Sequence, residues 1–224
     1  MKNIAIIPAR GGSKRLPNKN ILLLGGIPLI AHSILYAQLN KDIVDEVYVS
    51  TEDAAIKKIA LHYGAQVIDR PEYLSGDFEP TISCMQHVLK TIPDTVDTVF
   101  LLQPTNPLRP ENLLREAFES YQMSDAESLF TITRNHQKLA KIPKHCYEPF
   151  NYTIGQRSQD LEPIYFENGL LYISKEKLIK DGKIFYENSV PFEVNHIFAT
   201  VDIDAQDDFD YAEYLFQKRI TDNR

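Results

Sequence analysis

The sequence predicts an α/β protein with a mostly parallel sheet that is covered by helices on both faces. Two observations support this fold class. Short apolar runs typical of buried strands alternate with helical patterns along the chain, and the 224 residues contain no internal repeat or linker. Alternating strands and helices are typical of parallel sheets with both faces buried, and this length suits one domain. We therefore expect residues 1–224 to form a single domain.

The expected elements follow from apolar periodicity and from cap and turn residues. Strands are predicted over residues 3–8, 46–51, 66–68, 98–102, 128–133, 169–173 and 196–201. Helices are predicted after Pro28, after the capping residue Asp53, and over residues 80–91, 111–121, 175–180 and 207–218.

Residues 135–165 are polar, contain prolines and lack a period, which is unusual for a loop inside a compact domain. We interpret residues 135–165 as an inserted hairpin or flap with a functional or subunit-contact role.

Composition excludes several classes of protein. The formal net charge of −7 argues against binding to duplex nucleic acid. No apolar run approaches the roughly 18 residues that a membrane helix needs, so no membrane association is expected. Cys84 and Cys146 lie far apart and outside any metal-ligand spacing. Two free thiols in a reducing compartment fit them best, and we expect the protein to be cytoplasmic.

Charge is distributed unevenly along the chain. Residues 1–20 contain five cations and no acid, whereas residues 201–213 contain six acids and no base. Such an arrangement in an acidic chain indicates a local site for an anion and a local site for a cation.

The basic segment directly follows the first predicted strand. It begins with Arg10, Gly11 and Gly12 and continues through Ser13-Lys14-Arg15 to Lys19-Asn20. Glycines let the backbone approach a ligand closely, and arginine and lysine supply charge for phosphates. The spacing matches neither a P-loop nor a dinucleotide fingerprint. Phosphate binding is the favoured interpretation, and a basic surface turn is the alternative.

The acidic segment contains Asp202-Ile203-Asp204 at the end of the last predicted strand. Residues two apart on a strand share a face, so both carboxylates could bind one divalent cation together with phosphate oxygens. The alternative is that Asp204 only caps the last helix.

A third polar loop, Gln103-Pro104-Thr105-Asn106-Pro107-Leu108-Arg109, follows the strand over 98–102. Its side chains could recognise a base or a sugar hydroxyl, although a structural turn is the favoured interpretation when the segment is taken alone. In parallel sheets, ligands bind beyond the carboxyl ends of the strands. All three loops are therefore expected at the same edge.

These segments resemble the bacterial CMP-nonulosonate synthetases, the cytidylyltransferases that activate sialic acid and its relatives. The resemblance runs in order through nearly the whole chain, over residues 6–20, 70–81, 103–109, 157–161 with 167–172, and 202–209. It implies a Rossmann-like, GT-A-like nucleotidyltransferase sandwich of three layers, with a mostly parallel mixed sheet and a small inserted dimerisation flap at about 135–190. The chain is unlike the CMP-Kdo branch of the superfamily. The basic segment of that branch starts with Ser-Thr-Arg-Leu-Pro, where this chain has Gly-Ser-Lys-Arg-Leu-Pro at residues 12–17.

The resemblance also implies roles for matching residues. Residues that hold CTP would be Ala9, Arg10, Gly11, Gly12, Ser13, Lys14, Lys19, Asn20, Arg70, Thr81 and Gln103. Residues that hold the sugar acid would be Gln103, Thr105, Arg157, Gln159 and Asn168. Asp202 and Asp204 would bind Mg²⁺, with Mn²⁺ as an alternative ion, and would act in catalysis together with Arg10, Lys14 and Lys19.

The activity implied is transfer of CMP from CTP to a nine-carbon 2-keto sugar acid by a Mg²⁺-dependent homodimer. Tyr165, Phe166 and Glu167 precede Asn168, where some sialic-acid enzymes have a second arginine. This difference leaves room for a deoxy-diamino nonulosonate in place of N-acetylneuraminate. The alternatives are a related nucleotidyltransferase acting on Kdo or a sugar phosphate, and a nucleotide-binding protein without catalytic activity.

Overall fold

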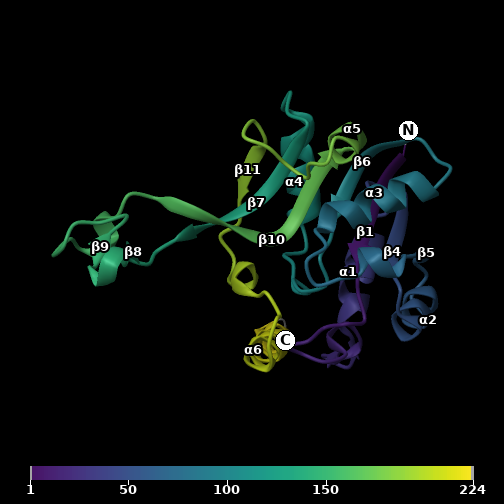
Figure 1. Ribbon diagram of the computed structural model, residues 1–224, viewed down its shortest axis with the longest axis horizontal. Coiled ribbons are helices and arrows are strands. Elements are labelled where there is room, and N and C mark those ends of the chain that lie inside the picture. Colours follow the sequence, from purple (N-terminus) through teal and green to yellow (C-terminus); the bar gives the residue numbers. More distant parts are fainter. Residues whose placement is uncertain (1, 223–224) are drawn as a thin grey trace.

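The computed structural model describes residues 2–222, with side chains described to residue 218, and its centre is a seven-stranded sheet (Figure 1). In spatial order the strands are β11 (Val190–Glu193), β7 (Ser128–Asn135), β10 (Ile164–Lys175), β6 (Val96–Leu101), β1 (Lys2–Pro8), β4 (Glu46–Thr51) and β5 (Gln66–Asp69). β10 is antiparallel to both of its neighbours, and the other pairings in this sheet are parallel. The predicted α/β class with a mostly parallel mixed sheet is confirmed.

Helices cover both faces of the sheet, as expected. Those on the sheet are α1 (Leu29–Leu39), α2 (Ala54–His62), α3 (Thr81–Thr91), α4 (Leu113–Gln122) and α5 (Glu176–Lys180), and a sixth helix, α6 (Gln206–Asp222), packs on the N-terminal segment. Apolar side chains of α1, α2 and α4 pack on one face, and those of α3 and α5 pack on the other.

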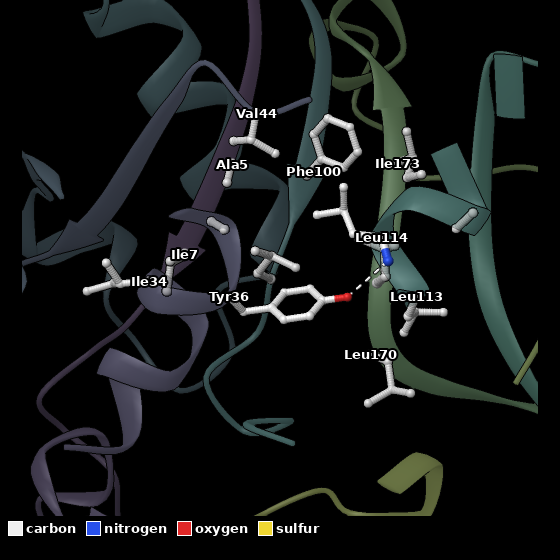
Figure 2. Packing of buried hydrophobic residues seen from close by; sticks show 14 of the residues in the cluster. Ala5, Ile7, Ile34, Tyr36, Val44, Phe100, Leu113, Leu114, Leu170 and Ile173 are labelled. Carbon is white, nitrogen blue, oxygen red and sulfur yellow. Dashed lines mark hydrogen bonds between the residues drawn. The ribbon is translucent and has the colours of Figure 1, made fainter. Parts of the chain in front are cut away.

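Strand β1 shows how alternation builds these two layers. Ala5 and Ile7 belong to the cluster under α1, whereas Ile4 and Ile6 belong to the cluster under α3. Successive strand residues point to opposite faces, so a strand that is apolar throughout supplies both cores. Figure 2 shows the first cluster, where the Tyr36 hydroxyl accepts a hydrogen bond from the backbone N–H of Leu114 at 2.9 Å.

A third apolar cluster joins the two ends of the chain. Phe209 and Leu215 of α6 pack with Leu16 and Leu24 from the N-terminal segment. Leu24 lies in a small hairpin of β2 (Leu23–Leu24) and β3 (Ile27–Pro28), which the sequence analysis did not predict.

The predicted strand over residues 196–201 is wrong. The segment forms a short 3₁₀ helix, η5 (Ile197–Thr200), because the His196 side chain and carbonyl accept hydrogen bonds from the N–H groups of Phe198 and Ala199. The edge of the sheet beside β7 is formed by β11, a strand that the sequence analysis did not predict. Consequently Asp202 and Asp204 do not follow a strand.

Residues 136–163 form an arm that projects away from the sheet between β7 and β10 (Figure 1). It contains the two-stranded sheet of β8 (Ala140–Lys141) and β9 (Glu148–Pro149) and the 3₁₀ turns η3 (Pro143–His145) and η4 (Ser158–Asp160). Within the region at 135–190 that was interpreted as a flap, this arm is the projecting part, whereas β10 and α5 belong to the main body.

Candidate active site

The first loop leaves β1 at Pro8 and is held by its own chain and by the end of β4. The Asn20 side chain is buried and donates to the Arg10 carbonyl at 2.9 Å. The backbone N–H of Gly11 donates to Glu52 at 2.8 Å. Gly11 must lack a side chain, because a Cβ there would lie 2.4 Å from the Asp53 carboxylate, whose other oxygen caps α2 by accepting from the Ile56 N–H at 2.9 Å.

This loop forms one wall of a cavity of about 490 Å³ at the carboxyl ends of β1, β5 and β6, which we call the basic cavity. Its size is typical of a site for a small molecule. Its polar lining residues are Arg10, Ser13, Lys14, Arg15, Lys19, Asn20, Arg70, Asp77, Glu79, Thr81, Cys84, Gln103, Thr105 and Asp204. The expectation that the three loops meet at one edge of the sheet is met.

Two of the loop cations face an aspartate that the sequence analysis did not single out. Arg10 Nη1 lies 2.9 Å from Asp77 Oδ1, and Lys14 forms an ion pair with the same carboxylate. The hydrogen bond from Lys14, together with both positive charges, holds the pKa of Asp77 below its usual value. Asp77 therefore forms ion pairs with Arg10 and Lys14, two cations that an anionic ligand would need.

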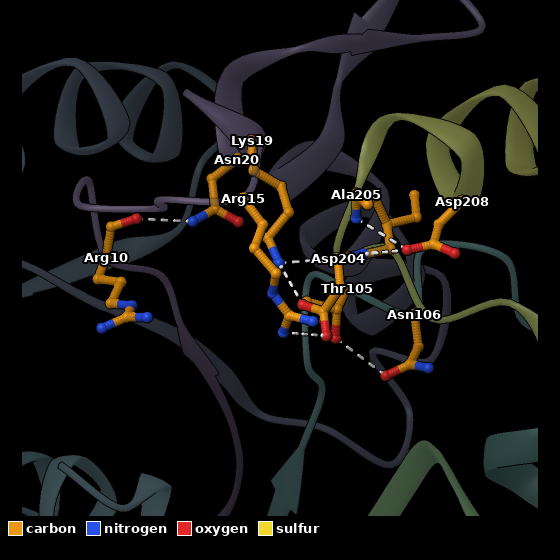
Figure 3. A network of polar contacts seen from close by, with 10 residues as sticks. Arg10, Arg15, Lys19, Asn20, Thr105, Asn106, Asp204, Ala205 and Asp208 are labelled. Carbon is orange, nitrogen blue, oxygen red and sulfur yellow. Dashed lines mark hydrogen bonds and ion pairs between the residues drawn. The ribbon is translucent and has the colours of Figure 1, made fainter. Parts of the chain in front are cut away.

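The other two cations meet Asp204 from the far end of the chain (Figure 3). Lys19 Nζ lies 3.0 Å from Asp204 Oδ1 and donates to the Ile203 carbonyl at 2.8 Å. Arg15 Nη2 lies 2.6 Å from the second Asp204 oxygen. Burial acts to raise the pKa of Asp204, but the hydrogen bond and charge of Lys19, with Arg15, outweigh it and lower the pKa.

The acidic segment is positioned by the loop after β6. The Ile203 N–H donates to the Thr105 carbonyl at 2.8 Å, and the Asn106 side chain donates to the Val201 carbonyl at 2.8 Å. The alternative that Asp204 only caps the last helix does not describe its contacts. Asp208 is the residue that accepts the backbone N–H groups of Asp204 and Ala205, at 2.9 and 2.8 Å.

Asp202 remains accessible to solvent and faces a second cavity. Partial desolvation, with the charge of Asp204, raises the pKa of Asp202, although the Thr105 hydroxyl acts against this. Among residues 2–222, no cluster of three or more histidine, cysteine, aspartate or glutamate side chains could hold a metal. Two carboxylates without a third protein ligand fit Mg²⁺, which commonly completes its shell with phosphate oxygens and water.

The second cavity has a volume of about 410 Å³ and shares Gln103 with the basic cavity. We call it the Asn168 cavity; its lining includes Asn106, Phe166, Glu167, Asn168, Gly169, Tyr172, Thr200 and Asp202. The Asn168 amide is largely used within the protein. Its oxygen accepts from the Thr131 hydroxyl at 2.6 Å and from the Leu170 N–H at 3.1 Å, and its nitrogen donates to Thr133 at 2.9 Å.

Arginines fix the remaining walls. Arg70 is buried and donates to the Ser50 hydroxyl at 3.1 Å and the Ser50 carbonyl at 2.5 Å. Arg109 is also buried and donates to the carbonyls of Leu170 and Gln103 at 2.7 and 2.9 Å. Burial lowers the pKa of Arg109 to about 10. Arg109 thereby sets the position of the Gln103 backbone between the two cavities.

Some predicted residues lie outside both cavities. Ala9, Gly11 and Gly12 shape the first loop without lining the basic cavity. Arg157 and Gln159 lie on the arm and line neither cavity of their own chain. Arg157 Nε lies 2.8 Å from Asp160.

The sequence analysis overlooked residues that act through long-range contacts. Asp77 and Glu52 contact the first loop from positions 67 and 41 residues away, and Asp208 orders the turn that presents Asp204. The only sequence signal was that acids follow strands β4 and β5, Glu52 directly and Asp77 further along its loop, at the edge where the basic loop also lies.

A parallel α/β sheet with cations, carboxylates and a cavity at the carboxyl ends of its strands defines a nucleotide-binding protein of the doubly wound kind. The model of the family described as cytidylyltransferase matches residues 4–224. The chain therefore belongs to the cytidylyltransferase family, and its enzyme class is that of the cytidylyltransferases.

Two relatives match over nearly their whole length. A pseudaminic acid cytidylyltransferase of Campylobacter jejuni is 34% identical, with 97% of each chain covered. A CMP-N,N'-diacetyllegionaminic acid synthase of Legionella pneumophila is 36% identical, again with 97% of each chain covered. The solved structure of a CMP:2-keto-3-deoxy-manno-octonic acid synthetase complexed with CTP has a TM-score of 0.74 over 98% of this chain and 100% of that chain. At 18% identity it supports the fold.

Proposed function

We propose that this cytidylyltransferase transfers CMP from CTP to the anomeric hydroxyl of a nine-carbon 2-keto sugar acid, releasing pyrophosphate. The observation that carries the proposal is the pair of adjoining cavities. The basic cavity has the cations for a triphosphate, and the Asn168 cavity meets it at Gln103. The two relatives named above act, by their names, on acids of this class.

The protein's own residues would act mainly through position and charge. Arg10, Lys14 and Lys19 would neutralise the phosphates and stabilise the departing pyrophosphate. A bond forms between the anomeric oxygen and the α-phosphorus while the bond from that phosphorus to the β-phosphate oxygen breaks. The hydroxyl proton passes to a carboxylate or a water molecule near Asp204. Arg70 and Thr81 lie on the wall where the nucleoside would bind, and Gln103 and Thr105 lie where the acid would meet it.

We also propose that Mg²⁺, or Mn²⁺ in its place, is held by Asp202 and Asp204. A bound ion would supply positive charge to polarise the α-phosphate. The donor chemistry supports this, since both carboxylates flank the junction of the cavities.

Three further properties complete the proposal: a homodimer, a cytoplasmic location, and a function in making activated sugar donors for glycans. The exposed arm supports the dimer, because it presents apolar side chains to solvent, among them Ile142 at 70% and Ile154 at 81% exposure. Cys84 and Cys146 are free thiols, which suits a reducing compartment. Within the described chain, no helix combines the length and apolar character needed to cross a membrane.

Release of pyrophosphate from CTP, UTP, ATP and GTP, each paired with nonulosonates, Kdo and sugar phosphates, tests the reaction. We expect turnover with CTP and a nonulosonate. Turnover with Kdo or a sugar phosphate alone would favour a related nucleotidyltransferase instead, as the solved synthetase of similar fold suggests. CTP binding without turnover for any acceptor would indicate a protein without catalytic activity.

Asp204→Asn tests the metal site. We expect turnover to fall by about 10²-fold or more, with a much weaker dependence on Mg²⁺, because one metal ligand loses its charge. Asp207→Asn is a matched control, since Asp207 lies exposed in the first turn of α6. Full Mg²⁺-dependent activity of Asp204→Asn would contradict the metal assignment.

A further inference from the structure

A third cavity, of about 670 Å³, lies at the base of the arm and adjoins the Asn168 cavity. The two cavities share Phe166 and Thr200 as lining residues. We call it the Arg134 cavity; it is built by the end of β7, the start of β10 and the segment after β11. The three cavities therefore follow one another, joined at Gln103 and then at Phe166 and Thr200.

Arg134 is a cation of this cavity that the described residues leave unpaired. It is half-buried on β7, in register with Tyr165 of β10. Its Nε is shielded from solvent and has no hydrogen-bond partner among the described residues. The rest of the guanidinium forms no ion pair or hydrogen bond within the described chain, so its N–H groups at the cavity wall are available to a ligand oxygen.

The other polar lining residues favour a ligand rich in acceptors. Asn195 offers an amide donor, and Glu193 is the single acidic residue among those that line the cavity. Phe166 adds an apolar surface at the entrance from the Asn168 cavity. An amide-bearing chain, with carbonyl oxygens and short apolar groups, has the matching chemistry.

The covalent structure of the proposed substrate decides which part of it reaches this cavity. The inference rests on the proposed function. In a 2-keto acid the carboxylate is bonded to the anomeric carbon, so it must stay beside the reacting phosphate at the junction near Gln103. The opposite end of a nine-carbon acid extends away from that junction, through the Asn168 cavity. We propose that Arg134 binds the acylamino carbonyl or hydroxyl oxygens of this distal end and selects for acylated nine-carbon acids.

Kinetics of Arg134→Met with a distally acylated nonulosonate, and with the same acid bearing a hydroxyl in place of the acylamide, test this role. For the acylated acid we expect KM to rise about 10-fold or more, as for loss of a charged hydrogen-bond donor. The KM for CTP and the KM for the hydroxyl analogue should change less than about 2-fold. Arg134→Lys, which keeps one charged donor, should recover part of the loss.

The matched control is Arg115→Met, which removes an exposed arginine of α4 that is paired with Asp42 and lines none of the three cavities. Its kinetics should match wild type with both acids. An equal rise in KM for both acids in Arg134→Met would show a structural role, and a dimer that dissociates would assign Arg134 to the subunit contact. Either result, or an unchanged KM for the acylated acid, would overturn the role of Arg134 and leave the proposed function intact. Failure of the wild-type protein to use any nine-carbon acid would instead overturn the proposed function as well.

Discussion

At the scale of single residues, two aspartates divide the cations of the first loop between them. Asp77 pairs with Arg10 and Lys14, and Asp204 pairs with Lys19 and Arg15. The Asp77 and Asp204 carboxylates lie in different segments of the chain, before α3 and before α6. Asp77 lies in the loop before α3 and is not part of the acidic segment, so we interpret it as a placeholder that a triphosphate displaces.

Asp77→Asn should lower the KM for CTP by about 2- to 5-fold, because a partly exposed ion pair that opposes binding is worth under about 1 kcal/mol. The difference from wild type should shrink at high salt, which screens charges at the surface. Steady-state kinetics at low and high ionic strength would measure both effects.

Asp125→Asn provides the control, since it makes the same change of charge at an exposed position outside the cavities. A KM for CTP that rises in Asp77→Asn would instead assign Asp77 a direct part in binding the nucleotide or its metal.

Arg10 and Gln103 could be located because they follow predicted strands, and the rule for the carboxyl edge of parallel sheets brings them together. Arg70, which follows β5 and lines the same cavity, came from the resemblance. Asp77 and Arg134 could not be located in this way, because their importance depends on partners, or the lack of one, across the fold.

At the scale of elements, most helices and strands lie near their predicted ranges, and the main errors fall in the segment from β11 to η5. Helix α3 matches its predicted range within one residue, whereas β11 was overlooked and residues 196–201 were assigned to a strand. Pro191 weakens the strand signal of β11, yet an edge strand tolerates proline. The apolar run 197–201 resembles a strand, but the bonds of His196 turn it into a 3₁₀ helix.

The join between the first loop and α2 gives an element-scale prediction. Gly11→Ala places a Cβ 2.4 Å from Asp53, the N-cap of α2, whereas Gly12→Ala meets nothing within 4 Å. Displacing the cap should cost about 1 kcal/mol or more, which lowers Tm by about 2–4 °C in a protein of this size.

Gly12→Ala should change Tm by less than about 1 °C, and thermal unfolding of the pair measures the difference. The KM for CTP should rise in Gly11→Ala alone. Equal changes in Tm for the two substitutions would show that the Asp53 side chain moves away from the added Cβ without a loss of stability.

At the scale of the whole molecule, the two ends of the chain close one site. Lys19 and Asp204 are 185 positions apart in sequence, and the cluster under α6 holds both segments in place. A second set of long-range contacts lies at the opposite edge of the sheet, where Lys2 of β1 pairs with Glu46 of β4 and with Asp94 before β6.

This second set predicts how stability depends on acid. The hydrogen bond from Lys2, followed by that from Tyr48, lowers the pKa of Glu46 below its ordinary value of 4.5. The folded state then binds fewer protons than the unfolded state as pH falls below about 4.5. The contribution of Glu46 is present above that pH and is lost as pH falls through the folded pKa.

Urea unfolding between pH 3 and pH 7 should therefore show a shallower loss of stability on acidification for Glu46→Gln than for wild type. Glu111→Gln, at an exposed position with no described partner, should follow the wild-type curve. If the free energy of unfolding had the same dependence on pH in all three proteins, Glu46 would not contribute to the loss of stability in acid.

The arm provides the last prediction, because it separates Arg157 from the cavities of its own chain. If the arm joins two copies, Arg157 of one protomer would complete the sugar-acid site of the other, and Ile154→Glu should give a monomer with little activity. Light scattering would report the oligomeric state.

A subunit-mixing experiment tests whether Arg157 acts in the partner's site. Lys19→Met and Arg157→Ala should each be nearly inactive alone. After mixing and reassembly, half of the dimers contain one subunit of each variant, and each such dimer has one intact site of two, so about one quarter of wild-type activity should return. No recovery in dimers shown to have exchanged subunits would place Arg157 outside the partner's site.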